Sequence, residues 1–221
     1  MEAYLGISTD KLLTAGAETI YMVCISLFIG AIIAFPLAIL LYLTRKNGMY
    51  QNRFVNGLLN IIINVIRSTP FIIMLVCVMP LTKVLVGTRI GTKAALVPLT
   101  IYIAPYLARL MEGALLETKA GIIEAAEAMG ATPLQIVWHF ILPESLGSLI
   151  LTITTGTIGL IGATAMAGYI GGGGIGNIAL TYGYQQFNNR LMFFTVLILI
   201  IVVQLIQNLE TWASAKIRRA R

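Results

Sequence analysis

The sequence predicts an all-α membrane protein, with five transmembrane helices and a two-helix loop between the third and the fourth. Three observations support this fold class. The 221 residues are 58% hydrophobic and only 11% charged, whereas a soluble domain carries about 25% charged residues. The mean hydropathy is +0.89. Apolar runs of about 20 residues, the length that a helix needs to cross the hydrocarbon core, recur along the chain. We therefore expect one transmembrane domain over residues 1–221, embedded in a lipid bilayer.

Each predicted span lies where charged residues are scarce. The stretch 145–189 has no charged residue, but its second half is rich in glycine, so we expect a span followed by a loop there. Across all five spans, the charged residues are Arg67, Arg109, Glu112 and Glu210. The predicted spans are 19–43, 55–82, 94–116, 145–169 and 191–211.

Arg67 and Arg109 are the basic residues inside these spans, and a charge in a span is costly and often functional. A long basic side chain can instead extend along its helix to the interface. We favour this second interpretation for both residues, because we expect them towards the cytosolic ends of their spans. Glu112 follows Arg109 by three residues, so these two side chains can pair on one helix face.

The basic residues of the loops predict the orientation of the chain. Eight Lys and Arg residues fall on the side that holds the C-terminus and the loop 117–144, and five fall on the other side. Lys216–Arg221 follows the last span directly, where basic residues have most influence. We expect a multi-pass protein of the inner or plasma membrane, with its N-terminus outside and its C-terminus in the cytosol. The net charge of +6 then reflects these flanks and not a nucleic-acid surface.

The loop 117–144 has the local chemistry of two helices separated by a break. A run of helix formers precedes Gly130, which can adopt the left-handed conformation that ends a helix. Thr132 then suits the N-cap of a second helix, and Gln135 completes a capping box three residues later. Pro143 is expected to limit the continuation of this second helix.

Each of these two helices has an apolar face that needs a partner. The faces either pack on the spans of the same chain, lie in the lipid interface, or form a docking surface for another protein. We favour the docking surface, because two separately capped helices form a rigid unit. The first face holds Ile122, Ile123, Ala126 and Met129, and the second holds Leu134, Val137, Trp138 and Ile141.

The spacing of the loop resembles the EAA loop of ATP-binding-cassette importer permeases. Glu-Ala-Ala at 124–126 is followed by three residues, Gly130, nine residues and then Phe-Ile-Leu-Pro at 140–143. The chain departs from the family pattern at Phe140, where Ile is usual. The resemblance implies a fold like that of type I importer permeases, and a loop that docks into a groove on a cytosolic ATP-hydrolysing subunit. It assigns the coupling role to Glu124, Ala125, Ala126, Gly130, Phe140, Leu142 and Pro143.

Further stretches narrow the resemblance to amino-acid importers. The Arg-Ser-Thr-Pro sequence at 67–70 resembles the Arg-Ser-x-Pro stretch of that group. The segments 104–117, 128–137 and 171–177 are similar to the methionine-importer (MetI-like) permease family. The resemblance implies a homodimer that forms the pathway for methionine, a cytosolic ATPase dimer, and an external substrate-binding (lipo)protein. An importer for another amino acid or a methionine derivative is the alternative.

The fourth span has small residues every three or four positions and softer side chains near its end. Gly156, Gly159 and Ala163 let helices approach closely, within the chain, between two copies or around a pore. Met166 and Tyr169 are candidate pathway or gate residues, because they suit a thioether amino acid.

Other classes of function have little support in the sequence. Gly171 to Gly176 matches a dinucleotide fingerprint in form, but a span precedes it and no acidic residue lies between Glu144 and Glu210. We expect a tight external turn there. A phosphate-binding loop is absent, and His139 is the only histidine, so we expect no ATPase site, no catalytic residues, no metal and no cofactor on this chain. An ion-driven carrier is a remote alternative, because five spans do not form two equal repeats. An adaptor that only anchors an ATPase is the third class.

Overall fold

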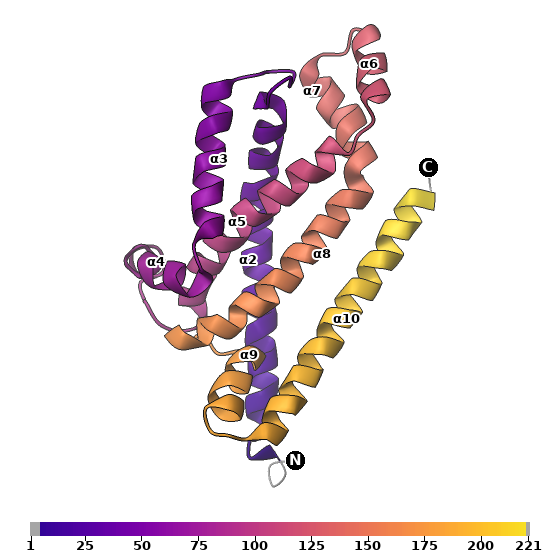
Figure 1. Cartoon of the computed structure of the whole chain (residues 1–221). Helices are drawn as coiled ribbons and strands as arrows, with labels where there is room; N and C mark the ends of the chain where they lie inside the picture. The colour runs from indigo at the N-terminus through magenta and orange to yellow at the C-terminus, as the bar shows by residue number, and fades with distance from the viewer. Residues whose placement is uncertain (1–4, 220–221) are drawn as a thin grey trace.

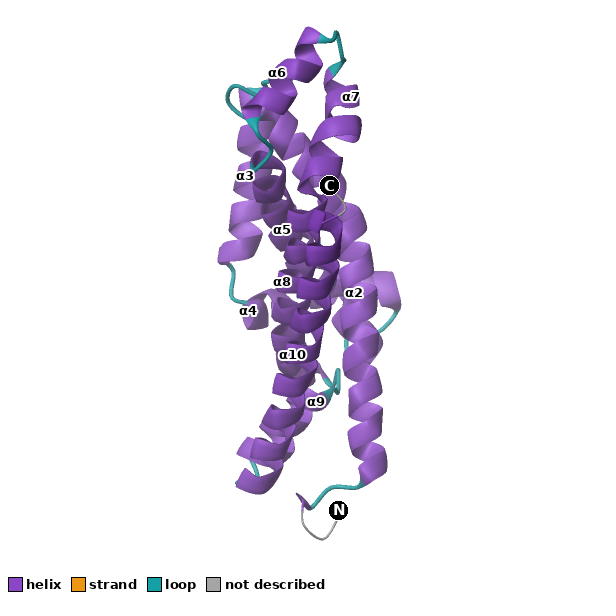
Figure 2. Ribbon diagram, turned by 90° about the vertical axis from the view of Figure 1, so that its right-hand side faces the viewer, coloured by secondary structure: helices purple, strands orange, loops and turns teal. Residues whose placement is uncertain are grey.

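The computed structural model describes residues 5–219, and for 213 and 215–219 it describes only the backbone. Within this part of the chain the regular structure is entirely helical (Figures 1 and 2), as the sequence predicts. The helices are α2 (Thr9–Thr44), α3 (Arg53–Ser68), α4 (Phe71–Val86), α5 (Thr92–Leu116), α6 (Ala120–Ala128), α7 (Pro133–Ile136), η1 (Val137–Ile141), α8 (Leu142–Ala167), η2 (Gly168–Ile170), α9 (Ile175–Ile178), η3 (Ala179–Tyr184) and α10 (Asn189–Arg219).

The longest helix, α2, runs almost the full length of the molecule (Figure 1). It begins ten residues before the predicted span at 19, because the Ser8 side chain accepts a hydrogen bond from the Lys11 N–H at 3.3 Å and caps it. Helix α2 packs along α5, which in turn packs on α8. A side chain in place of Gly30 would collide with Ile103 of α5, so glycine permits this close approach.

Gly156 likewise permits the close approach of α8 to α5. A Cβ at this position would lie 2.5 Å from the Leu107 Cδ2 atom. Of the alternatives for the small residues of the fourth span, packing within the chain therefore accounts for Gly156. The core between these helices is aliphatic, with Leu99, Ile103 and Leu107 completely buried.

The predicted span 55–82 is not one helix. Helices α3 and α4 meet at an angle of 111° (Figure 1). Pro70 causes the break, because it lacks an N–H group and disfavours helical geometry at the residue before it. Thr69 accordingly has extended backbone angles, with φ −80° and ψ 122°. In the described residues, four helices are long and apolar enough to cross a membrane, and the bent pair makes a fifth span if it is counted as one.

The predicted stop at Pro143 is also wrong, because the chain stays helical from Pro133 to Ile170. The turn before Pro143 is a π-helix, in which the Leu142 N–H donates to the carbonyl of Val137, five residues back. This wider turn accommodates a proline ring that would clash with the preceding turn of an ordinary α-helix. The second helix of the loop is thus the beginning of the fourth span.

A glycine turn connects α8 to α9 and confirms the tight turn expected there. Gly171, Gly173 and Gly174 have φ values of 72°, 73° and 92°, a region that side chains with a Cβ rarely adopt. Gly174 N–H donates to the carboxylate of Glu18 at 2.9 Å, and so the turn is held against α2.

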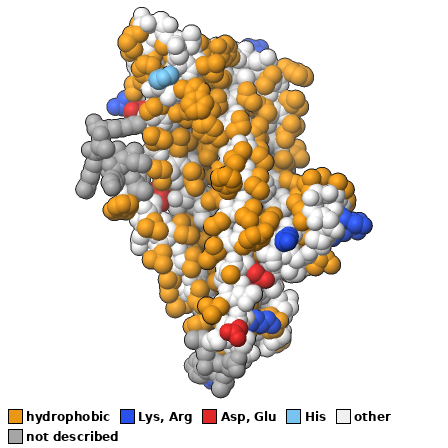
Figure 3. Space-filling model, turned by 180° about the vertical axis from the view of Figure 1, so that it is seen from behind, with side chains coloured by type: hydrophobic (Ala, Val, Ile, Leu, Met, Phe, Trp, Pro, Cys, Tyr) orange, Lys and Arg blue, Asp and Glu red, His pale blue; other side chains and the backbone are white. Residues whose placement is uncertain are grey.

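The two ends of the molecule differ in what they carry. Helices α6 and α7 project at the end where α10 finishes, and the glycine turn and the start of α2 lie at the other end (Figures 1 and 2). Hydrophobic side chains cover most of the face between these ends that Figure 3 shows. Phe28 and Ile32 of α2 are among the exposed apolar side chains. Such a surface suits contact with lipid. The side chains of the predicted basic cluster Lys216–Arg221 lie outside the described residues.

Candidate functional site

The strongest candidate site is the projecting unit formed by α6 and α7. Helix α6 ends in a Schellman motif around Gly130, whose φ is +79°. The Gly130 N–H donates to the carbonyl of Glu127 at 2.9 Å, and the Ala131 N–H donates to that of Ala126 at 3.1 Å. Both hydrogen bonds satisfy carbonyl groups at the helix end, so the direction in which the chain leaves α6 is fixed.

The predicted capping box at the start of α7 is confirmed. The Thr132 hydroxyl accepts from the Gln135 N–H at 3.4 Å, and the Thr132 N–H donates to the Gln135 side chain at 2.8 Å. Pro133 occupies the first helical turn, where the missing N–H is not needed. The loop is therefore a short, defined connection between two helices.

The two predicted apolar faces are divided between the interior and the surface. Ala126, Val137 and Ile141 are buried in the core of the chain itself, as expected if the loop packs on its own spans. In contrast, Met129 is 70% exposed, and Leu134 and Trp138 are more than half exposed. The three exposed side chains, Met129, Leu134 and Trp138, form what we call the docking surface.

The residues that the resemblance assigns to coupling follow the same division. Ala126 and Leu142 are buried, Phe140 and Pro143 are half-buried, and Glu124, Ala125 and Gly130 are exposed. The buried members fix the loop on the body of the protein, and the exposed members are accessible to another chain.

A cavity of about 300 Å³ separates α6 from the turn that follows α2. Glu124 and Glu127 line it on the α6 side, and Arg45 lines it on the other side. The Arg45 guanidinium also lies 4.3 Å from the ring centroid of Tyr42. Opposite charges across this cavity favour the observed position of α6.

The charged residues of the third span join two helices. Arg109 and Glu112 form the predicted ion pair, at 2.6 Å between Nη1 and Oε2. Arg109 also donates to the Asn60 side chain of α3, and the Asn60 amide donates to the Asn56 carbonyl at 2.8 Å. Arg109 thus fixes α3 against α5 and does not extend freely to an interface, contrary to expectation. Sequence reasoning missed Asn56 and Asn60, although asparagines spaced by four residues gave a signal for a polar helix face.

Arg67 also departs from the expectation that it reaches the cytosolic interface. Helix α3 begins at the end of the molecule that carries α6 (Figure 1). Arg67 lies in its last turn, about 21 Å further along the helix axis at 1.5 Å per residue. It is therefore found about halfway along the molecule, at the junction with α4 (Figure 1).

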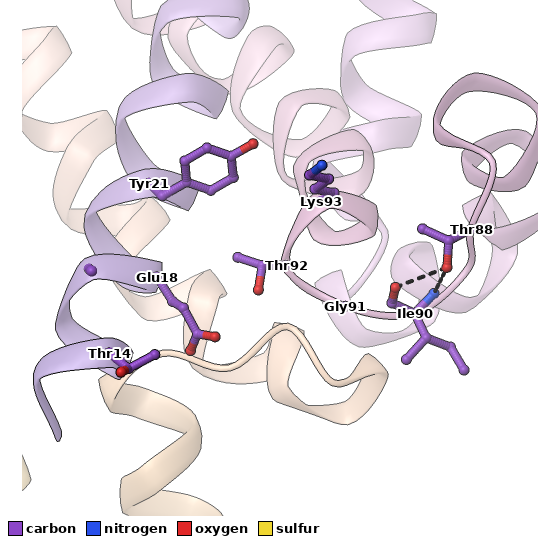
Figure 4. Close-up of a pocket in the computed structure, with 9 residues that line it drawn as sticks. Thr14, Glu18, Tyr21, Thr88, Ile90, Gly91, Thr92 and Lys93 are labelled. Atoms are coloured by element: carbon purple, nitrogen blue, oxygen red, sulfur yellow. Dashed lines mark hydrogen bonds between the residues drawn. The ribbon is translucent and has the colours of Figure 1, made fainter. Parts of the chain in front are cut away.

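The opposite end of the molecule has an open cavity of about 590 Å³. Glu18 and Tyr21 of α2 line it together with Thr92 and Lys93 at the start of α5. In Figure 4 the Tyr21 ring points across the cavity towards Lys93, and the Glu18 carboxylate points towards the glycine turn. The Gly174 N–H holds the Glu18 carboxylate at the rim. This cavity presents an acid, a base and hydroxyl groups to whatever approaches this end.

The predicted pathway candidates lie near the end of α8, and neither lines the cavity of Figure 4. Met166 is 43% exposed and Tyr169 is 70% exposed. Tyr169 lines a separate cavity of about 210 Å³ with Asn177 and Thr181. Their role in a pathway stays a prediction. Among the described residues, no three His, Cys, Asp or Glu side chains lie together in a group that could hold a metal ion.

Residues 26–219 match the family described as "Binding-protein-dependent transport system inner membrane component". The chain belongs to this family. It is therefore an inner membrane component of a transport system, as its apolar helices and its loop pattern indicate.

Named relatives of this inner membrane component cover almost its whole length. A probable D-methionine transport system permease protein MetI of Vibrio cholerae is 43% identical over 98% of this chain and 95% of its own length. The methionine import system permease protein MetP of Bacillus subtilis is 43% identical over 91% of this chain and 90% of its own length. The resemblance to MetI-like permeases is thus confirmed.

Solved structures share the fold. A chain of the MetNI methionine ABC transporter in an inward-facing conformation matches with a TM-score of 0.90 and 43% identity, over 96% of this chain and 99% of that one. A chain of an amino acid ABC transporter matches with a TM-score of 0.78 at 17% identity, over 94% of each chain, which bears on the fold alone. The all-α importer fold expected from the sequence is confirmed.

Proposed function

We propose that this chain is the permease subunit of an ATP-driven methionine importer, and that it forms the pathway as a homodimer. The capped α6–α7 unit carries the proposal, because Met129, Leu134 and Trp138 of its docking surface stay more than half exposed. Trp138 also contacts the chain itself, with its ring centroid 6.1 Å from that of Phe35 in α2. The relatives named for methionine transport support the substrate.

The energy would come from a cytosolic ATPase dimer that binds this unit. Two copies of the chain have inward-open and outward-open arrangements, and closure of the ATPase dimer on ATP shifts the balance between them. Helix α8 transmits the displacement, because it continues from α7 without a break. The chain itself has no phosphate-binding loop, and so hydrolysis takes place on the partner.

An external substrate-binding protein would deliver methionine at the other end. The glycine turn and the cavity of Figure 4 lie there, with Glu18 and Lys93 accessible. This arrangement requires the N-terminus outside and the C-terminus in the cytosol, which agrees with the distribution of basic residues in the loops.

The test is reconstitution of this chain, its ATPase and its binding protein in proteoliposomes. We expect uptake of labelled methionine that requires all three proteins and ATP on the ATPase side. Uptake without ATP would overturn the proposal. Competition with a panel of unlabelled amino acids identifies the substrate, since stronger inhibition by another amino acid would exclude methionine.

A further inference from the structure

Helix α3 has three different faces, and its polar face is partly free. One face packs on the rest of the chain through Ile63, which is buried. A second face is apolar and exposed, as expected for contact with lipid. The third face, between these two at 100° per residue, is polar. The lipid-type face holds Phe54, Leu58, Ile62 and Val65, and the polar face holds Asn56, Asn60, Asn64, Arg67 and Ser68.

The half of the polar face nearest α6 is satisfied within the chain, and the other half is not. Asn56 and Asn60 make hydrogen bonds to the α2 backbone and to Arg109, respectively. In the described part of the chain, the Arg67 guanidinium makes no hydrogen bond or ion pair. Its only interaction there is with the Tyr106 ring, whose centroid is 5.9 Å away. Asn64 is exposed.

An exposed charge about 21 Å along a membrane helix cannot be left in hydrocarbon. It must face water, a ligand or another chain. A second copy offers no free carboxylate at this depth. Among the nine acidic residues of the sequence, those within the spans are Glu112, which Arg109 already pairs, and Glu210, near the end of the last span. The polar face therefore borders an aqueous space in which Arg67 lacks a counter-ion.

The junction of α3 and α4 forms the surroundings of this charge. The Ser68 and Thr69 hydroxyls donate to the Val65 carbonyl at 3.1 and 2.8 Å, and so they stabilise the end of α3. Beside it, Tyr106 stacks on Tyr102 with ring centroids 6.2 Å apart. The Arg67 guanidinium thus lies next to an aromatic wall that can hold an apolar side chain.

We propose that Arg67 binds the carboxylate of the amino acid in transit, while Tyr106 and Tyr102 contact its side chain. A guanidinium presents two parallel N–H donors that match a carboxylate, and such charge-assisted hydrogen bonds are stronger than those between neutral groups. The inference rests on the proposed function, since it requires an amino acid as substrate, and it adds a binding residue at the junction of α3 and α4.

Binding to the permease–ATPase complex without nucleotide and without binding protein tests the role of Arg67. The probes are L-methionine, N-acetyl-L-methionine, which keeps the carboxylate, and L-methioninamide, which lacks it. We expect Arg67→Gln to weaken the binding of L-methionine and N-acetyl-L-methionine at least about tenfold. The binding of L-methioninamide should stay unchanged. The control Arg89→Gln removes an exposed positive charge outside the spans and should behave as wild type.

Wild-type complex that neither binds nor transports methionine would overturn the proposed function. Wild-type complex that binds methionine, together with an Arg67→Gln variant that keeps the same preference for carboxylates, would overturn only this inference.

Cysteine accessibility gives a measurement that does not depend on the Arg67 variant folding. In a complex with Cys24 and Cys77 replaced by Ala, Asn64→Cys should react with a charged methanethiosulfonate reagent, and methionine should protect it. The matched variant Ile62→Cys, on the lipid-type face, should not react. Equal reaction at both positions, or no protection at Asn64→Cys, would contradict a binding site on the polar face.

Discussion

Gly130 offers the sharpest test of the α6–α7 unit, because only its backbone conformation requires glycine. Its φ is +79°, and a Cβ built on it meets no atom within 4 Å. Gly130→Val therefore adds no clash. Its free-energy cost comes only from holding a β-branched residue in the left-handed conformation, which is about 1–2 kcal/mol or more. That free energy lowers the population of the α6–α7 geometry relative to alternatives by a factor of about 5–30.

The chain contains a matched control in Gly121, which lies in α6. A Cβ there also meets nothing within 4 Å, and its φ lies outside the left-handed region. Gly121→Val should not destabilise α6, since valine is no worse than glycine inside a helix. The free-energy cost of Gly130→Asn should lie between zero and that of Gly130→Val, because asparagine adopts left-handed angles more readily than valine.

The assay is methionine uptake per ATP hydrolysed in proteoliposomes that contain the full transporter. We expect this ratio to fall for Gly130→Val, by at most about 5–30-fold, with normal membrane insertion and continued hydrolysis. It should stay at the wild-type value for Gly121→Val. If both valine variants reduce uptake equally, the left-handed conformation at 130 is not the cause and the reasoning fails.

Three further changes test individual contacts. Thr132→Ala should destabilise α7 by about 1 kcal/mol, seen as faster hydrogen exchange there, whereas Thr132→Ser should not. Gly30→Leu should lower the thermal unfolding temperature of the purified permease, since overpacking against Ile103 costs about 1–3 kcal/mol; an unchanged temperature would refute the close α2–α5 contact. Arg109→Gln should lower this temperature by leaving Glu112 unpaired, and adding Glu112→Gln should restore much of it; additive losses would contradict the pairing.

The α6–α7 unit could be predicted from the sequence because its determinants are local. A left-handed glycine, an N-cap threonine and a glutamine three residues later each act on neighbouring backbone groups. Gly130, Thr132 and Gln135 accordingly have the predicted roles. The Arg109–Glu112 pair is local in the same sense, since three residues separate its members. The bond from Arg109 to Asn60 spans 49 residues, and only the packing of α3 on α5 determines it.

The two prolines show why helix breaks could not be read from proline alone. Pro143 was expected to limit a helix, but the π-turn before it leaves room for the ring. Pro70 lies in a stretch apolar enough for a continuous span, and there the helix breaks. The difference lies in the preceding residues, because the hydroxyls of Ser68 and Thr69 satisfy the Val65 carbonyl at the end of α3. Whether a turn widens or ends thus depends on which partner its carbonyl groups find.

The unbroken helix through Pro143 has a consequence for how coupling can work. The helical stretch from Pro133 to Ile170 carries Leu134 and Trp138 of the docking surface near one end, and the glycine turn follows the other end. A hinge at Pro143 would absorb a displacement of α7, whereas a continuous helix transmits it. At the far end, Glu18 and Thr19 of α2 accept N–H groups of Gly174 and Ile175, both at 2.9 Å. Motion of α7 that passes beyond the glycine turn therefore tilts α2 together with α8 or breaks these two hydrogen bonds, and either outcome changes the shape of the outer end.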